Sequence, residues 1–209
     1  MPNLNSLLVF QAQKGDFLDC ADLIERGADV DYINYQGYCA LHHAARNDNH
    51  KLSQLLLQHG AQIDALDRDG RTPLQLAAMI GNTEVCLLLL SKGANINTRD
   101  QAGKTPLHTA TSMRHLDLCE VLLDHGAELE AITRFHMTPL MIALRNGDIM
   151  ASLLYLERGA DCSRINTALE ATSLHYPECE AAVRTWLLAK SARNALVNIS
   201  QFSEIDKHR

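Results

Sequence analysis

The stretch DRDGRTPLQLAAMIGNTEVCLLLLSKGANINTR, from Asp67 to Arg99, decides the fold because the next 33 residues repeat its pattern. They read DQAGKTPLHTATSMRHLDLCEVLLDHGAELEAI, from Asp100 to Ile132. The same step of 33 separates four Leu residues and the Gly-Ala pairs that close five units. These are Leu41, Leu74, Leu107 and Leu140, with Gly-Ala pairs beginning at Gly27, Gly60, Gly93, Gly126 and Gly159. A fixed period of this length predicts stacked helical units rather than one closed core.

Each unit is predicted to begin with a tight turn and to continue into two helices. Asp at the first position can accept local backbone hydrogen bonds, and Gly at the fourth tolerates a positive φ. A Thr-Pro pair then starts a short helix, with Thr as the N-cap and Pro in the first turn. These pairs begin at Thr72, Thr105 and Thr138. The second helix carries one apolar stripe and ends at Gly-Ala, where Gly fits a left-handed cap.

The two ends of the array differ from its middle. Asp19 stands in the column of Leu52, and Gln11 in the column of Ala44, so the first unit is predicted to expose a polar face, as capping repeats do. Near the other end, 178–190 is predicted to be a capping helix with Arg184 in the column of Asp19. Its expected docking stripe is Cys179, Ala182, Val183, Trp186 and Leu187. We therefore expect a single, complete domain over 1–198, followed by a tail over 199–209.

The sequences TPLQLAA from Thr72 and TPLHTAT from Thr105, the period of 33 and the closing GAxIN or GAxLE resemble ankyrin repeats, whose motif includes T-P-L-H-x-A. The resemblance implies an all-α solenoid of about six helix-turn-helix units with β-turn hairpin loops and capping terminal repeats. The units cover about 3–33, 34–66, 67–99, 100–132, 133–165 and a degenerate 166–198. It also implies a non-catalytic protein–protein interaction module acting as an adaptor, an inhibitor or a targeting subunit.

Residues that would carry catalysis or bind a metal are explained by the repeat columns instead. All eleven glycines fall in turn, inter-helix or cap columns, so none is left for a phosphate loop. His42 and His108 share one column, and the resemblance implies that they hydrogen-bond within and between repeats. Cys20, Cys86 and Cys119 share a column with Ser, and no CxxC occurs. We therefore expect free thiols in a reducing compartment, with no enzyme activity, metal or cofactor.

Composition and charge argue against several other classes of protein. The net charge is −6 and the pI is near 5.9, which disfavours nucleic-acid binding through bulk charge. No stretch approaches the roughly 20 apolar residues that span a bilayer, and the N-terminus lacks the basic region of a signal peptide. We expect a monomer in the cytoplasm, with the nucleus open as a second location, and no membrane association. Whether it acts in its own cell or as a pathogen effector delivered into a host cell stays open.

The resemblance implies that partners bind a concave face, formed by the turn tips and the exposed side of the first helices. The columns concerned contain five Arg and one Lys against one Asp, together with Tyr, Phe and Met. Such side chains are enriched at interface cores, so we expect an acidic partner segment that carries apolar anchors. The alternatives are that Arg and Met only cover neighbouring helices, or that the Arg-rich face serves a nucleic-acid-associated regulator. The candidate residues are Tyr35, Tyr38, Arg46, Arg68, Arg71, Met79, Ile80, Lys104, Met113, Arg134, Phe135, Met137 and Arg145.

Two units depart from the motif. Arg114 replaces the inter-helix glycine and His136 replaces the turn glycine, at positions where a positive φ is expected. The altered turn, 133–137, is either a contact point or the product of drift in a tolerant loop. Asn97 resembles the site at which some ankyrin proteins are hydroxylated by an asparaginyl hydroxylase. Asp31, Asp64 and Glu130 share its column, so a plain polar turn residue is the alternative.

Overall fold

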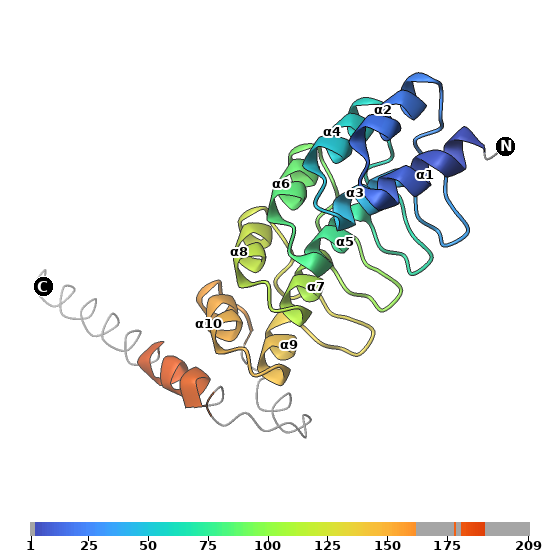
Figure 1. Ribbon diagram of the computed structural model, residues 1–209. Coiled ribbons are helices and arrows are strands. Elements are labelled where there is room, and N and C mark those ends of the chain that lie inside the picture. The colour runs from blue at the N-terminus through green and yellow to red at the C-terminus, as the bar shows by residue number, and fades with distance from the viewer. Residues whose placement is uncertain (1–2, 162–177, 179–180, 191–209) are drawn as a thin grey trace, which may run out of the picture.

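The structure is a computed structural model that describes residues 3–161, 178 and 181–190. Between Leu4 and Glu157 it consists of helix pairs joined by long loops (Figure 1). The first helices are α1 (Leu4–Lys14), α3 (Ala40–Arg46), α5 (Pro73–Ile80), α7 (Pro106–Ser112) and α9 (Pro139–Arg145). The second helices are α2 (Phe17–Glu25), α4 (His50–Gln58), α6 (Thr83–Ser91), α8 (Leu116–Asp124) and α10 (Ile149–Glu157). No strand occurs in this part of the chain, so the predicted all-α repeat fold is confirmed.

The helices form two parallel rows. Each first helix packs on the first helix of the next unit and on its own second helix, and the second helices form the other row. Figure 1 shows the loops between units projecting from the first row, away from the second. Residues 181–190 form a further helix. The count of six units stays a prediction, because 162–177 and the tail over 199–209 lie outside the described residues.

The first helices begin where the Thr-Pro pairs predict. Thr72 Oγ1 accepts a hydrogen bond from the N–H of Gln75 at 3.3 Å, and Pro73 is the first residue of α5. Thr105 and Thr138 cap α7 and α9 in the same way. Each cap satisfies one of the N–H groups that a helix N-terminus leaves without a partner, so the chain fixes the start of every such helix locally.

The second helices end in a left-handed residue, as expected. At the end of α6, Gly93 has φ 91°, and its N–H donates to Leu90 O at 3.0 Å. The N–H of Ala94 donates to Leu89 O at 3.0 Å, which completes a Schellman motif. The cap residue itself is Lys92, so the glycine lies one position beyond it. The five Gly-Ala glycines all have positive φ, which explains why Gly recurs there.

Positive φ without glycine occurs at three described positions. Arg114 has φ 62° and His136 has φ 56°, so both predicted departures adopt the backbone that glycine would favour. Asp48 has φ 55° and was missed, although it lies in the same column as Arg114. The side chain of Arg114 donates to Asn146 O of the next unit, a contact that glycine could not make.

The core is a continuous stack of buried columns. Leu41, Leu74, Leu107 and Leu140 are at most 2% exposed. At the N-terminal end, Asp19 is exposed and accepts a hydrogen bond from Gln11 Nε2 at 2.5 Å, as expected for a polar end face. In the helix over 181–190, Val183 joins the core, while Trp186 and Leu187 pack against it. The predicted docking stripe is therefore confirmed at these three positions, whereas Cys179 lies outside the described residues.

Candidate partner-binding surface

Each turn is held by the side chain at its first position. Asp67 Oδ1 accepts hydrogen bonds from the N–H groups of Asp69 and Arg71, both at 2.8 Å. Asn34 and Asp100 do the same in their turns. In the altered turn, Thr133 Oγ1 accepts from Phe135 N and Met137 N, both at 3.2 Å. A hydroxyl therefore replaces the carboxylate without loss of the turn.

Neighbouring turns are bonded into one row. The N–H of Gln101 donates to Asp69 O at 2.8 Å, and the N–H of Arg134 donates to Ala102 O at 2.9 Å. Arg68 lies directly against the first turn, since a Cβ placed on Gly37 would be 2.7 Å from Arg68 Cγ. Equivalent side chains of successive turns are therefore held in line along the array.

A second row of hydrogen bonds ties each first helix to the turn of the next unit. Gln75 Nε2 donates to Lys104 O at 2.6 Å. His42 Nε2 lies 3.2 Å from Arg71 O, and His108 Nε2 lies 3.1 Å from Met137 O. Burial lowers the pKa of both histidines, so each imidazole is neutral and has one donor and one acceptor nitrogen. The structural role that the resemblance implied for His42 and His108 is confirmed, and Gln75 fills the same role between them.

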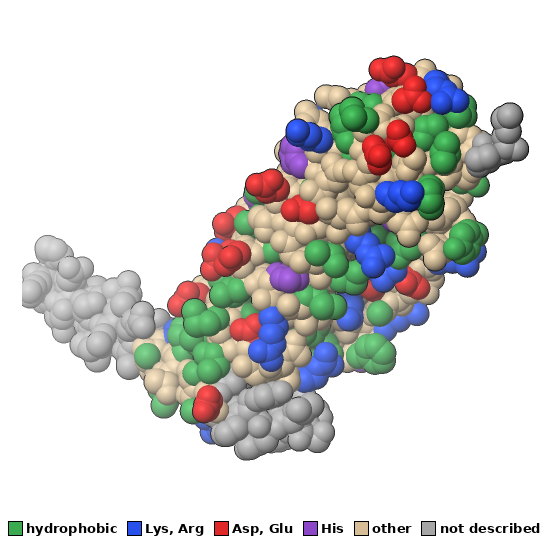
Figure 2. Space-filling view, in the orientation of Figure 1, with side chains coloured by type: hydrophobic (Ala, Val, Ile, Leu, Met, Phe, Trp, Pro, Cys, Tyr) green, Lys and Arg blue, Asp and Glu red, His purple; other side chains and the backbone are tan. Residues whose placement is uncertain are grey.

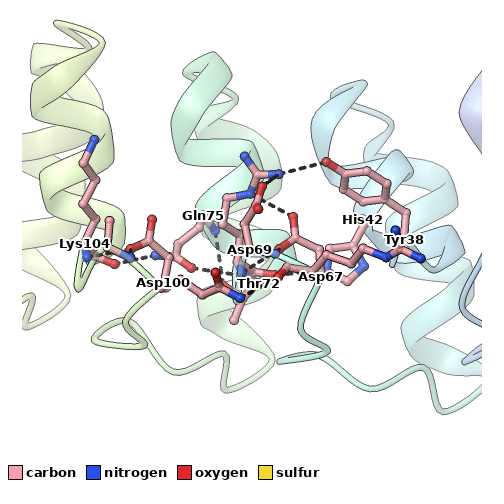
Figure 3. A network of polar contacts seen from close by, with 12 residues as sticks. Tyr38, His42, Asp67, Asp69, Thr72, Gln75, Asp100 and Lys104 are labelled. Carbon is pink, nitrogen blue, oxygen red and sulfur yellow. Dashed lines mark hydrogen bonds and ion pairs between the residues drawn. The ribbon is translucent and has the colours of Figure 1, made fainter. Parts of the chain in front are cut away.

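Arg71 belongs to the polar network that includes Tyr38, Asp67 and Asp69, which are labelled in Figure 3. Its guanidinium pairs with Asp67 at 2.8 Å and with Asp69 at 2.7 Å, and it donates to the hydroxyl of Tyr38 at 3.0 Å. The Tyr38 ring in turn packs against His42, with centroids 5.7 Å apart. Tyr38 and Arg71, two of the candidate binding residues, therefore bond one unit to the next. Both are only partly exposed.

The other candidates lie on the turn tips and on the exposed side of the first helices, the surface that we call the concave face. Tyr35 and Phe135 are highly exposed, at 78% and 76%. Met79, Lys104 and Met137 are half-buried. The exposed remainder are Arg46, Arg68, Ile80, Met113, Arg134 and Arg145. None of the five cations in these two groups forms an ion pair with a described residue.

Charge is divided between the two sides of the array. The five second helices carry eight Asp or Glu residues, three in α2, one in α6, three in α8 and one in α10, against one Lys in α4. Figure 2 shows Asp and Glu along the edge formed by the second helices, whereas Lys and Arg gather along the opposite edge, where the turns project. The face that carries the candidates is therefore basic in a chain of net charge −6.

A cleft of about 450 Å³ opens at the N-terminal end of the concave face, between α1 and the first turn. Of its lining residues, only Tyr35 is among the candidates that the sequence predicted, and the α1 wall was missed because the concave columns were followed from the second unit onward. The signal that could have found this wall is the spacing of Ser6, Val9, Phe10 and Gln13, which places them on one face of α1. The lining residues are Ser6, Val9, Phe10, Gln13, Tyr32, Asn34, Tyr35 and Gln36.

Comparison with known families agrees with this geometry. A model of ankyrin repeats, three copies long, matches residues 8–100 and 98–166. This chain belongs to the ankyrin-repeat family. Ankyrin repeats are generally protein–protein interaction modules and are typically non-enzymatic. A comparison with curated proteins finds none that matches the chain.

Asn97 links two units of the ankyrin array. Its Oδ1 accepts a hydrogen bond from the N–H of Glu128 at 2.9 Å. Asp31, Asp64 and Glu130 make the equivalent bond in their own units. The column therefore selects a side-chain acceptor for a structural reason, and hydroxylation of Asn97 stays a prediction.

The described part of the ankyrin array holds no cluster of three or more His, Cys, Asp or Glu that could bind a metal ion. Its four cysteines are free and buried. Burial raises the pKa of Cys20 and Cys86 to about 12, so these thiols stay protonated and are poor nucleophiles. Cys162 and Cys179 lie outside the described residues. None of the described helices is long and apolar enough to cross a bilayer.

Proposed function

We propose that this ankyrin array binds a partner protein through its concave face, and that the partner contributes an acidic segment carrying apolar anchors. The observation that supports it is the row of exposed cations, free of ion pairs among the described residues, on the face opposite the acidic second helices. Complementary charge guides association and selects partners, while exposed Tyr, Phe and Met supply contact area. The chain acts as an adaptor, an inhibitor or a targeting subunit, monomeric before it binds, in the cytoplasm or nucleus.

The proposal is tested by affinity purification with mass spectrometry from the source cells, using the wild-type chain and Arg68→Glu/Arg134→Glu. The double variant should lose most of a partner that the wild type enriches, by about tenfold or more. Lys51→Glu/Lys92→Glu is the matched control, because it changes net charge equally at exposed sites along the second helices. Equal enrichment by all three chains would overturn the proposal.

Arg71 is excluded from this test on structural grounds. A glutamate at position 71 would face the carboxylates of Asp67 and Asp69 and would leave a buried carboxylate without its cation, since the Asp67 side chain is 1% exposed. Loss of a buried ion-pair partner commonly removes several kcal/mol of stability. A binding defect in that variant would therefore report unfolding rather than recognition.

The same unpaired cations are the observation that favours the second candidate, a nucleic-acid-associated regulator. Phosphate binding releases counterions, so affinity for random-sequence DNA or RNA would fall steeply with salt. Filter binding at two salt concentrations separates the candidates. A steep salt slope that is lost in Arg68→Glu/Arg134→Glu would favour nucleic acid over an acidic protein segment.

A further inference from the structure

The tie between first helix and next turn changes at the N-terminal end of the array. Val9 occupies the column of His42, Gln75 and His108, the three residues that reach the carbonyl of the following turn. Valine has no donor, so α1 cannot form this bond with the carbonyl of Tyr38. No side chain in this column therefore bonds α1 to the first turn. The cleft of about 450 Å³ lies between these two elements.

One wall of the cleft is a single face of α1, formed by Ser6, Val9, Phe10 and Gln13. Phe10 is 49% exposed, whereas Leu76 in its column is fully buried. The difference arises because α1 already begins at Leu4, where later units have their turn, so no turn of its own covers Phe10. Tyr35 stands on the opposite wall and is 78% exposed. Two aromatic rings thus face solvent across a hollow whose volume lies in the range of ligand pockets.

The charge around the cleft matches the proposed partner. Its lining contains no charged side chain. At its rim, Lys14 Nζ lies 4.4 Å from the centroid of the Phe10 ring. Arg68 follows Tyr35 in the same turn column and lies against Gly37 of the first turn. An uncharged hollow with aromatic rings on both walls, bordered by cations, fits an apolar side chain that has acidic neighbours.

We infer that this cleft holds one large aromatic or aliphatic side chain of the acidic segment and thereby fixes where the segment lies along the array. The inference rests on the proposed function. Packed helices are spaced by about 10 Å, and an extended chain rises about 3.3 Å per residue. One repeat therefore corresponds to about three residues of the bound segment.

This spacing sets a register for the partner. Arg68 lies one unit beyond Tyr35, so its acidic partner falls about three residues from the anchor. Arg134 lies three units beyond Tyr35, so a second acidic residue falls about nine residues from the anchor. The segment is thus one apolar anchor followed by two acidic positions in the register of the repeats.

The test selects phage-displayed random 16-residue peptides on the full-length chain and measures binding of an enriched peptide by fluorescence polarisation. Enriched peptides should carry an aromatic or large aliphatic residue with Asp or Glu about three and nine positions away. Tyr35→Ala and Phe10→Ala should each weaken binding about tenfold or more. Changing the peptide's anchor to Ala should give a similar loss, and that loss should be absent in the Tyr35→Ala chain. Leu18→Ala, also highly exposed but on α2, is the matched control and should bind like wild type.

The outcomes separate the two proposals. If binding depends on Arg68 and Arg134 but not on Phe10, Tyr35 or the anchor, the cleft inference is overturned and the proposed function stands. If enriched peptides lack acidic residues and ignore Arg68→Glu/Arg134→Glu, the proposed function fails as well. Thermal melts accompany each variant. Should Phe10→Ala lower the melting temperature, Tyr35→Ala decides alone, because a side chain 78% exposed contributes little to folding.

Discussion

Among the described residues, His43 is one of two buried side chains that have a polar atom without a hydrogen-bond partner, the other being Ser53. The His43 imidazole is 4% exposed, and its Nε2 has no hydrogen-bond partner. The column of His43 holds Leu76 and Ile142 in other units, both buried. Burial lowers the pKa of His43 from 6.5 to about 4, with smaller contributions from His42 and Arg46. This position therefore opposes folding as pH falls.

We expect His43→Leu to raise the free energy of unfolding at pH 7.5 by about 1 kcal/mol, because it removes a buried nitrogen without a partner. The gain should be larger at pH 5. The unfolded chain takes up a proton near pH 6.5, but the folded chain does so only near pH 4. Wild-type stability is thus highest above pH 6.5 and decreases toward pH 4, and the loss through this residue is on the order of 2 kcal/mol by about pH 5. Urea unfolding at both pH values measures the difference.

His59→Gln is the control, since it removes an exposed histidine. It should leave the pH dependence of wild type unchanged. If His43→Leu and wild type lost stability in parallel between pH 7.5 and 5, protonation of His43 would not be the cause. His42 and His108 act in the same direction, because burial lowers their pKa values too, so part of the dependence should persist in His43→Leu.

The turns are the elements in which local chemistry can be tested most directly. His136 has φ 56° and is exposed, at the position where Gly37, Gly70 and Gly103 have positive φ. His136→Gly should therefore stabilise the chain by about 1 kcal/mol, measured as a higher midpoint in urea. Arg114→Gly is the comparison, because it relieves the same backbone strain but also removes the bond to Asn146 O. Its gain should be smaller, and equal gains would show that this contact contributes nothing.

The contrast between elements also explains what the sequence could predict. Thr72 with Pro73, Asp67 and the closing glycines act on backbone groups within a few residues, so their roles follow from spacing alone. The engagement of Arg71 with Tyr38 joins residues 33 positions apart in two units. The composition of the repeat columns predicted Arg71 and Tyr38 to be surface residues. It does not reveal which side chains meet across the interface between two units.

The cleft was harder to predict for a related reason. The cleft lies where Val9 provides no hydrogen-bond donor to the first turn. It also lies where α1 occupies the position that a turn has in later units. Both are differences between units, and both appear only when the first unit is compared with the fold of the others. The repeat pattern thus predicts what the units share, whereas the candidate site depends on where one unit differs from its neighbours.

On the scale of the whole molecule, each unit contacts only its neighbours, so stability is a sum over units and the interfaces between them. Gln75 lies at a central interface. Its Oε1 accepts from Thr72 N at 3.1 Å, and its Nε2 donates to Lys104 O at 2.6 Å, while the side chain is almost fully buried. One amide therefore satisfies a helix start in one unit and a turn carbonyl in the next.

Gln75→Met should weaken this interface and uncouple the two halves of the array. Met fits the helix position, since Met141 occupies it in the fifth unit, but it leaves Thr72 N–H and Lys104 C=O without these partners. We expect a loss of about 2 to 4 kcal/mol and faster hydrogen exchange at α5 and the following turn. Gln75→His should lose less than about 1 kcal/mol, because His42 and His108 make the equivalent bonds. A Gln75→Met chain that unfolds as cooperatively and as late as Gln75→His would show that the coupling between units resides in apolar contact alone.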